Sequence, residues 1–393
     1  MKKKTKQAGP AAWLRENKWT CAVLAAALVL LIVGRLLAAP ARVEAGQPEE
    51  RADYESAVVE QVLSDSTEKD PAADNGYRGE QLLLVTVKSG DYQGQQMQVY
   101  NYVGPLYGGP LHAGDRATIL ISSYSDGTVN ATVYEFDRLI PLAIVVALFI
   151  AAAVIVGGRT GAKSLVALAV TLMCLFGVLL PALMKGANTL LMTFIVCTYV
   201  AVVSLTIVGG VQKKSVCAML GAVAGTALAL LFGLLAQALT RVDGLRIEDV
   251  EPLLQLRQTG TPIGLRGLLV GGIIISALGA VMDVTMGIAS SLAEVHAANP
   301  QLSRRELFRS GMNIGRDMVG TMTNTLILAF LGSGFTLILY LYSLGLSFRQ
   351  LMSSAYVSME VVSGVASSVG VILSIPLTAL ITAAVFTREK QQS

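Results

Sequence analysis

Long apolar runs separated by short charged loops dominate the pattern of this chain. A run of about 20 apolar residues is long enough to cross the hydrocarbon core of a bilayer. The pattern predicts eight such spans, which makes the chain an all-α polytopic membrane protein apart from one segment. The spans lie at about 20–39, 139–157, 164–181, 187–208, 215–239, 267–291, 317–342 and 361–385.

The segment between the first two spans, residues 40–138, has a different pattern. Five short runs in it alternate between apolar and polar residues, with turn-forming residues between them. The runs cover 56–63, 81–88, 97–102, 117–122 and 128–136. Five short strands in so small a segment predict a small β-rich, OB-like barrel. Residues 40–53 are predicted to be a polar stalk, and 64–79 a flexible excursion.

Tyrosines in this segment leave two interpretations open. They line a groove for a sugar or a peptide, or they are ordinary strand residues with hydrated hydroxyls. The tyrosines are Tyr92, Tyr100, Tyr102, Tyr107, Tyr124 and Tyr134. The segment lacks the basic groove that single-stranded nucleic acid needs, so we expect no nucleic-acid partner.

Composition agrees with a membrane protein and excludes several kinds of site. The chain is 53% hydrophobic and only 15% charged, with a net charge of +3, and its mean hydropathy is +0.59. All four cysteines fall in predicted spans, which argues against a disulfide framework or a thiolate metal site. With only His112 and His296, a histidine-based metal centre is also disfavoured. No metal or cofactor is predicted.

Lysine and arginine set the predicted orientation. They cluster in the N-terminal tail and in the loops after the second, fourth and sixth spans, which share one side if both termini are cytoplasmic. The loop 241–266, which has four arginines, is a mild contradiction. The predicted organisation of the chain has five parts. They are a basic cytoplasmic tail (1–19), a first transmembrane helix (20–39), an extracytoplasmic β-rich domain (40–138), a seven-helix transmembrane domain (139–385) and a cytoplasmic tail (386–393).

The first span has a second interpretation. Small residues at 38–41 are compatible with a cleaved signal peptide, but a proline beside the cleavage site and the long apolar stretch favour a retained anchor. The glycine-rich segment 157–164 nearly spells a phosphate-binding loop. Because alanine stands directly before the lysine and a membrane helix precedes it, we interpret it as a tight turn.

Asp283, a carboxylate inside the sixth span, is the main candidate for chemistry. An ionisable group in a membrane helix costs several kcal/mol unless it is paired or hydrated, so such a group usually has a function. Helical spacing places Ser290 and Glu294 on the same face of that span. In the next span, Asp317, Thr321 and Asn324 lie at i, i+4 and i+7.

The last predicted spans supply the remaining candidates. Glu360, with Ser367 on the same helical face, would serve an outer access route, and Arg316 is near enough along the chain to counter the acids. We expect Asp283 and Asp317, with neutral oxygen ligands around them, to form a station for protons or a monovalent cation. The alternative for Glu294 and Asp317 is a simple helix-end role. For the serines and threonines it is bonding back to their own helix.

Two motifs also carry a resemblance. Residues 279–290 (GAVMDVTMGIAS) and 309–328 (RSGMNIGRDMVGTMTNTLIL), with the Pro-Leu-Thr near the C-terminus, resemble the YibE/F-like family of bacterial membrane proteins. The layout of one span, an outer domain and seven more spans is similar too. This resemblance implies a bacterial plasma-membrane protein, and it brings no settled activity.

A fainter likeness is to the SecD/SecF protein-export subunits, relatives of proton-driven exporters. Asp283, Glu294, the basic pair at 304–305 and the segment 321–332 stand where that family has a membrane acid, a glutamate, a basic loop and a Ser/Thr-rich helix. The chain lacks that family's Asp-Arg pair and has eight predicted spans instead of six, and a shared fold does not establish a shared function.

Two functions from different classes follow from these observations. The first is a transporter or exporter component with a proton or cation site on the sixth to eighth spans and an unknown substrate. The second is a non-transporting membrane platform whose outer domain binds an envelope partner or ligand. An enzyme is not expected, because neither histidine lies in a span and the two aspartates lack the sequence contexts of an intramembrane protease dyad. Expected partners are the bilayer, the transported ion, and a second copy or a second family member.

Overall fold

The computed structural model describes two compact units, Val43–Ala152 and the rest of the chain. The residues described are 25, 28, 32, 50–71, 76–124, 128–242, 251–258, 260, 262–265 and 267–387. The predicted span 20–39 therefore lies almost wholly outside them, as do the tail 1–19 and most of the tail 386–393.

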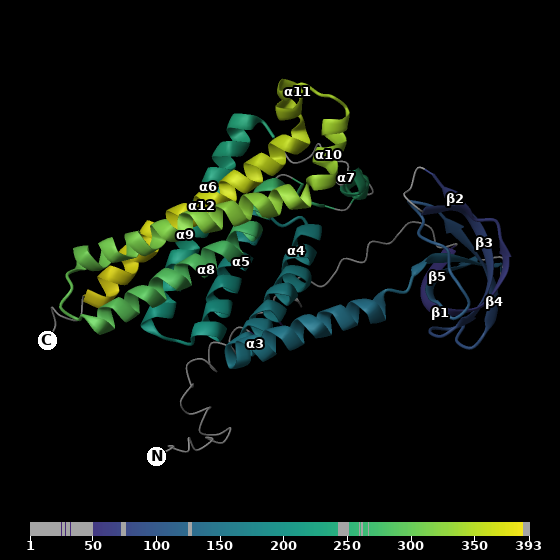
Figure 1. Ribbon diagram of the computed structural model, residues 1–393, viewed down its shortest axis with the longest axis horizontal. Helices are drawn as coiled ribbons and strands as arrows, with labels where there is room; N and C mark the ends of the chain where they lie inside the picture. The colour runs from purple at the N-terminus through teal and green to yellow at the C-terminus, as the bar shows by residue number, and fades with distance from the viewer. Residues whose placement is uncertain are drawn as a thin grey trace, which may run out of the picture. The chain divides into compact units, whose positions relative to one another are not determined.

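Five strands of the first unit close into a barrel (Figure 1). The strands of this unit are β1 (Glu50–Asp65), β2 (Glu68–Asp70), β3 (Gly76–Val87), β4 (Gln96–Val103), β5 (Arg116–Tyr124) and β6 (Val129–Phe136). Around the ring, β1 pairs with β3, β3 with β4, β4 with β6, β6 with β5, and β5 with β1. The β4–β6 pair is parallel and the others are antiparallel. The five predicted strands and the barrel are confirmed.

Two details of the prediction for this segment are wrong. Residues 50–53, assigned to a stalk, belong to β1 and pair with the end of β5. Within the excursion 64–79, β2 pairs with the start of β3. Neither stretch has an apolar alternation that sequence could reveal, because these strand ends are held by backbone hydrogen bonds and not by a buried face.

Alternating apolar residues fill the barrel, as the period of a β-strand requires. Leu83, Val85 and Val87 of β3 meet Ile119 and Ile121 of β5, and all five side chains are fully buried. Strand residues between them point outward, which is why the sequence alternates.

A buried polar network closes one end of this core. Gln81 and Asn101 are 1% and 2% exposed, and the Asn101 amide donates to Gln81 Oε1 at 3.0 Å. The same Oε1 accepts the Leu111 backbone N–H at 2.9 Å, and Gln81 Nε2 donates to Asp65 Oδ2 at 2.8 Å. Because each group has a partner, the network ties the segment after β4 to the barrel wall.

The second unit is helical. Its elements, together with α3, which begins in the first unit, are α3 (Leu139–Cys174), a π-helical turn η1 (Leu175–Leu179), α4 (Leu180–Met184), α5 (Thr189–Gly209), α6 (Lys213–Thr240), α7 (Glu251–Gln258), α8 (Leu268–Ala298), α9 (Arg304–Ser333), α10 (Phe335–Ser343), α11 (Phe348–Ser353) and α12 (Ala355–Thr387). Local caps start several of them. At α9, Ser303 Oγ accepts the Glu306 N–H while the Glu306 carboxylate accepts the Ser303 N–H, a reciprocal capping box.

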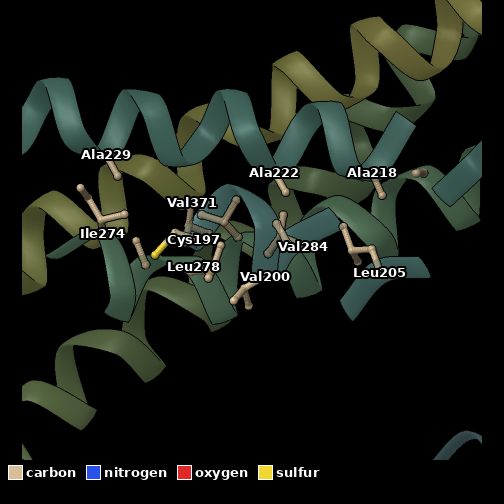
Figure 2. Close-up of a cluster of buried hydrophobic side chains, with 14 of the residues drawn as sticks. Cys197, Val200, Leu205, Ala218, Ala222, Ala229, Ile274, Leu278, Val284 and Val371 are labelled. Atoms are coloured by element: carbon tan, nitrogen blue, oxygen red, sulfur yellow. The ribbon is translucent and has the colours of Figure 1, made fainter. Parts of the chain in front are cut away.

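Helices α6, α8 and α12 pack closely in this unit, and α8, α9 and α12 run side by side (Figure 1). Small residues permit the close approach. A Cβ added at Gly370 of α12 would lie 2.6 Å from Ala229 Cβ of α6, and one added at Gly225 of α6 would lie 2.6 Å from Ser374 Cβ of α12. Figure 2 shows apolar side chains of this core, with Ala218, Ala222 and Ala229 along α6. Glycine and alanine at contacts are typical of membrane helix packing.

The described helices give five candidate membrane spans, or six if the bent pair α9–α10 counts as one. The predicted total of eight is not confirmed. Spans 139–157 and 164–181 fall in one helical run, Leu139–Met184, but Gly158 inside it has φ 54° and ψ −132°, so the run is broken there. The seventh predicted span is bent by 63° between α9 and α10.

Candidate functional site

Asp283 lies near the middle of α8, off the face that the helix buries. Residues Val281, Val284 and Ile288 of that face are fully buried against other helices. Asp283 is turned from them and remains accessible. Helical periodicity separates the two faces, so one helix both packs the core and presents a carboxylate beside it.

The carboxylate lines a pocket of about 400 Å³ between α3, α5 and α8. Most of the wall is apolar, including Cys197 and Val200 of α5 and Leu278 of α8, which lie near one another in Figure 2. Four lining residues have polar side chains, and these are Ser164, Thr171, Ser204 and Asp283. The site is an acid in a mainly apolar chamber with hydroxyls on the facing helices.

The hydroxyls have defined partners. Thr171 Oγ1 of α3 donates to its own helix at Ala167 O (2.9 Å) and lies 3.5 Å from Ser204 Oγ of α5. Ser164 Oγ donates to Thr160 O at 3.1 Å. Because each hydroxyl hydrogen is already donated, the lone pairs of the hydroxyl oxygens are what remains to bind a ligand. Neutral oxygen ligands of this kind suit a hard cation.

Sequence reasoning missed all three hydroxyl residues. Ser164 and Thr171 are seven residues apart, on one helical face, which is a signal that the sequence does contain. What the sequence lacks is any indication that α3 and α5, not α9, line the pocket with Asp283.

The predicted partners on α9 lie elsewhere. Asp317, Thr321 and Asn324 are exposed, and no lining residue of the Asp283 pocket comes from α9 in the described part of the chain. A Cβ at Gly315 would contact Ile375 Cγ2, so that side of α9 faces α12 and Asp317, two residues later, points away from it. Thr321 Oγ1 donates to its own helix at Met318 O, 3.1 Å away. The structure thus does not bring these residues to Asp283, and their part in an ion pathway stays a prediction.

Other predicted residues on α8 and α9 also lie outside the lining of this pocket. Glu294 is exposed, and Ser290 Oγ accepts a hydrogen bond from Lys214 Nζ of α6 at 3.3 Å. Lys214 was not among the predicted residues. Arg316 donates to Asn313 Oδ1 at 3.4 Å, a contact within α9.

Glu360 and Ser367 occupy two different environments on α12. Glu360 is half-buried and lines a second pocket, of about 150 Å³, with residues of α9 and α10. Its Cγ would lie 3.7 Å from a Cβ added at Gly334, the residue at the bend between α9 and α10. Ser367 is fully buried and pairs with Ser276 Oγ of α8 at 2.9 Å, so it fastens α12 to α8. The structure leaves Glu360 in a separate pocket from Asp283.

The described residues contain no cluster of side chains that could hold a metal ion, and their cysteines are buried. No group of three or more His, Cys, Asp or Glu side chains that could hold a metal occurs among them. Cys174, Cys197 and Cys217 are buried free thiols. Each lies in an apolar helix contact, where a thiol behaves as a small hydrophobic side chain.

Comparison with known proteins gives one result. No curated protein and no solved structure matches the chain. The model of the YibE/F-like protein family matches residues 145–388, which include α5, α6 and α8–α12 and most of α3 but not the barrel. The match covers more than half of the chain and contains Asp283 with every hydroxyl of its pocket. The chain therefore belongs to the YibE/F-like family.

Proposed function

We propose that the protein is a transporter or exporter component in which Asp283 binds and releases a proton or a monovalent cation. One observation carries the proposal. The Asp283 carboxylate, near the middle of α8, lines the pocket of about 400 Å³ and has no hydrogen-bond or ion-pair partner among the residues described. A membrane acid without a structural partner is expensive to keep, and acids of this kind mark ion pathways.

The chamber's chemistry supports a small cationic cargo. Thr171, Ser204 and Ser164 add hydroxyl oxygens to the carboxylate, and the described lining contains no basic residue. A proton on Asp283, or a cation held by its carboxylate and these oxygens, would neutralise the charge inside the apolar chamber. The substrate that accompanies the ion is not specified by this chemistry.

The carboxylates outside this chamber have subsidiary roles in the proposal. Glu360, in its pocket at the α9–α10 bend, is placed to pass ions on a second route. Bent or broken membrane helices commonly border transport sites. Glu294, close to the C-terminal end of α8, would act at a mouth of the pathway or only as a helix-end group. The helix-end alternative is wrong for Asp317, because α9 begins at Arg304 and Asp317 lies well inside it; this exposed aspartate would act at a mouth of the pathway.

The proposed topology has eight membrane crossings. It counts the first span at 20–39 and separates the helical run of α3 and α4 at Gly158, where the backbone leaves the helix. Both termini would be cytoplasmic and the barrel outside, following the distribution of Lys and Arg. The barrel would be OB-like, since its ring order with one parallel pair fits a five-stranded Greek-key barrel. The bacterial plasma membrane is the proposed location.

A second function is favoured by the barrel's surface. Tyr100 and Tyr102 are exposed on β4 with their rings stacked at 6.5 Å, and exposed Tyr54 and Tyr134 meet edge to face at 5.0 Å. Exposed aromatic pairs are typical of binding surfaces. In this alternative the helices form a non-transporting platform, and the barrel binds an envelope partner or ligand.

Ion flux in proteoliposomes tests the first function and separates it from the second. The wild type, Asp283→Asn and the matched control Glu60→Gln, on the exposed side of β1, would be compared under an imposed potential with a pH-sensitive dye inside. We expect flux in the wild type and the control and none in Asp283→Asn. Equal flux in all three would remove Asp283 from the mechanism. No flux in any, together with a cellular phenotype that requires residues 54–136 but tolerates Asp283→Asn, would favour the platform.

A further inference from the structure

The loop after β4 presents two large apolar side chains to solvent. Leu106 is 90% exposed, more than any other large apolar residue in the described chain, and Tyr107 is 65% exposed. An isolated water-facing loop has no reason to expose both at its tip. Such residues mark a surface that something covers.

The loop is rigid. Gly104 and Gly108 exchange two backbone hydrogen bonds of 3.0 Å, and the Tyr107 N–H donates to Gly104 O at 3.0 Å. Gly108 has φ +103°, a conformation that suits glycine. The tip is therefore a closed turn that holds Leu106 outward.

Strand register places this turn beside the start of α3. The parallel pair β4–β6 aligns Tyr100 with Thr132. Counting four residues on along both strands brings Gly104, where the turn starts, level with Phe136, the end of β6. A direct contact agrees: a Cβ added at Gly108 would lie 3.3 Å from Glu135 Oε2, and the Glu135 carboxylate is paired with Arg138 at 2.7 Å.

The junction between barrel and helix is fastened in the same place. The Asp137 N–H donates to Arg116 O at 3.0 Å, and the Asp137 carboxylate accepts the Leu139 N–H and the Ser56 hydroxyl, both at 3.0 Å. These bonds hold the first turn of α3 against the barrel. The loop cannot swing freely away from that turn.

A candidate membrane span begins where α3 begins. Leu139, Leu142 and Val145 are exposed in the first turns of a candidate membrane span. Only Asp137 and Arg138 separate Phe136 from Leu139, and a chain that short spans at most about 10 Å. The end of β6 therefore lies within about 10 Å of the start of that candidate span. Exposed Tyr134 and Phe136 lie at this end too, as aromatic residues do at membrane interfaces.

We propose that the loop Gly104–Gly108 is a membrane-docking element whose Leu106 and Tyr107 insert into the lipid interface beside α3. The occupant of this apolar tip is lipid, because the turn lies next to Glu135, four residues before the candidate membrane span of α3 begins. The docking fixes the height of the barrel above the bilayer, and it does not depend on whether Asp283 carries ions.

Fluorescence of the full chain in liposomes tests this docking. An environment-sensitive label would be placed at Leu106→Cys in a background with the four native cysteines replaced by alanine. The matched control is Gln95→Cys, an exposed site directly before β4 and so at the other end of that strand from the loop. We expect blue-shifted emission at position 106 and strong quenching by lipids that carry a nitroxide near the headgroup, with neither effect at position 95.

Two results would overturn the proposal. Emission at 106 equal to that at 95 would mean that the tip stays in water. A blue shift without quenching by the nitroxide lipids would mean that protein, such as a second copy, covers it.

A second variant guards against insertion by the label itself. In this variant the label is at Tyr107→Cys, and the additional change Leu106→Asp places a charge at the tip. The fold should persist, because Leu106 makes little contact with the barrel. Quenching should then fall toward the level of the control. Unchanged quenching would show that the label inserts without the loop and would contradict the proposal.

Discussion

The barrel and the helical unit differ in whether their main polar side chains have hydrogen-bond partners. At the end of the barrel, Gln81 and Asn101 are almost fully buried, and each makes hydrogen bonds to neighbours that hold the wall together. In the helical unit, Asp283 faces a chamber and no partner for its carboxylate occurs among the described residues. A buried polar group whose hydrogen bonds are satisfied is structural, whereas an accessible carboxylate without a partner is available to a ligand.

The largest expected effect is a loss of stability when the contact between α6 and α12 is overpacked. Gly370→Val would drive methyl groups into Ala229 of α6, and overpacking of this kind costs about 1–3 kcal/mol. Thermal unfolding in detergent should show a clear loss of stability. The control is Gly272→Ala, since a Cβ at that glycine meets nothing within 4 Å. Equal stability of the two variants would mean that α6 and α12 do not approach as described.

The barrel network is expected to be nearly as sensitive. Gln81→Leu removes the acceptor of the Leu111 N–H and the donor to Asp65, and an orphaned buried group costs about 1–3 kcal/mol. Denaturant unfolding of the barrel, followed by its β-sheet signal, measures the change. Gln98→Leu on the exposed side of β4 is the matched control and should have little effect. A tolerant Gln81 would remove the structural side of the comparison.

The pocket hydroxyls should affect ion flux without a comparable loss of stability. Thr171→Val keeps the shape but removes one oxygen next to Ser204, and a net hydrogen bond of about 1 kcal/mol corresponds to roughly a fivefold change in flux. Thr226→Val on α6, whose hydroxyl is buried and bonded to Ala222 O, serves as the control outside the pocket. If both variants lower flux alike, the hydroxyls of the pocket have no special role.

The smallest effect is a pH dependence in the barrel. Hydrogen bonds from Thr67, and then from Gln81, hold the pKa of the Asp65 carboxyl below its ordinary value of 3.8. A lowered folded-state pKa adds stability that is present above pH 3.8 and is lost as the pH falls through the folded-state value. Unfolding of the wild type should therefore show a slight extra destabilisation in that acidic window. Asp65→Asn should lack it, and an identical acid profile would contradict the role of these bonds.

The two units also differ in what their sequence could reveal. The alternation of apolar and polar residues located the barrel strands because one face of each strand is buried, as with Leu83, Val85 and Val87. It could not reveal β2, which pairs with β3 through the backbone and an Asp70–Arg78 ion pair and has no buried apolar face. Apolar length located the helices, and Gly158 breaks the run where the turn was expected.

The candidate site was only half predictable. The cost of a membrane carboxylate singled out Asp283, because that argument concerns one residue and its depth in a helix. Its neighbours depend on which helices meet. Spacing along one helix cannot tell that Thr171 and Ser204 line the pocket with Asp283 while Asp317 does not.

The most direct test of the account is the ion flux of two aspartate variants measured side by side. Asp283→Asn and Asp317→Asn remove the same charge from neighbouring helices, but only Asp283 lines the chamber between α3, α5 and α8. With equal amounts of folded protein in the liposomes, we predict that flux is abolished in Asp283→Asn and largely retained in Asp317→Asn. Retained flux in Asp283→Asn, with loss in Asp317→Asn, would contradict the assignment of the chamber as the ion site.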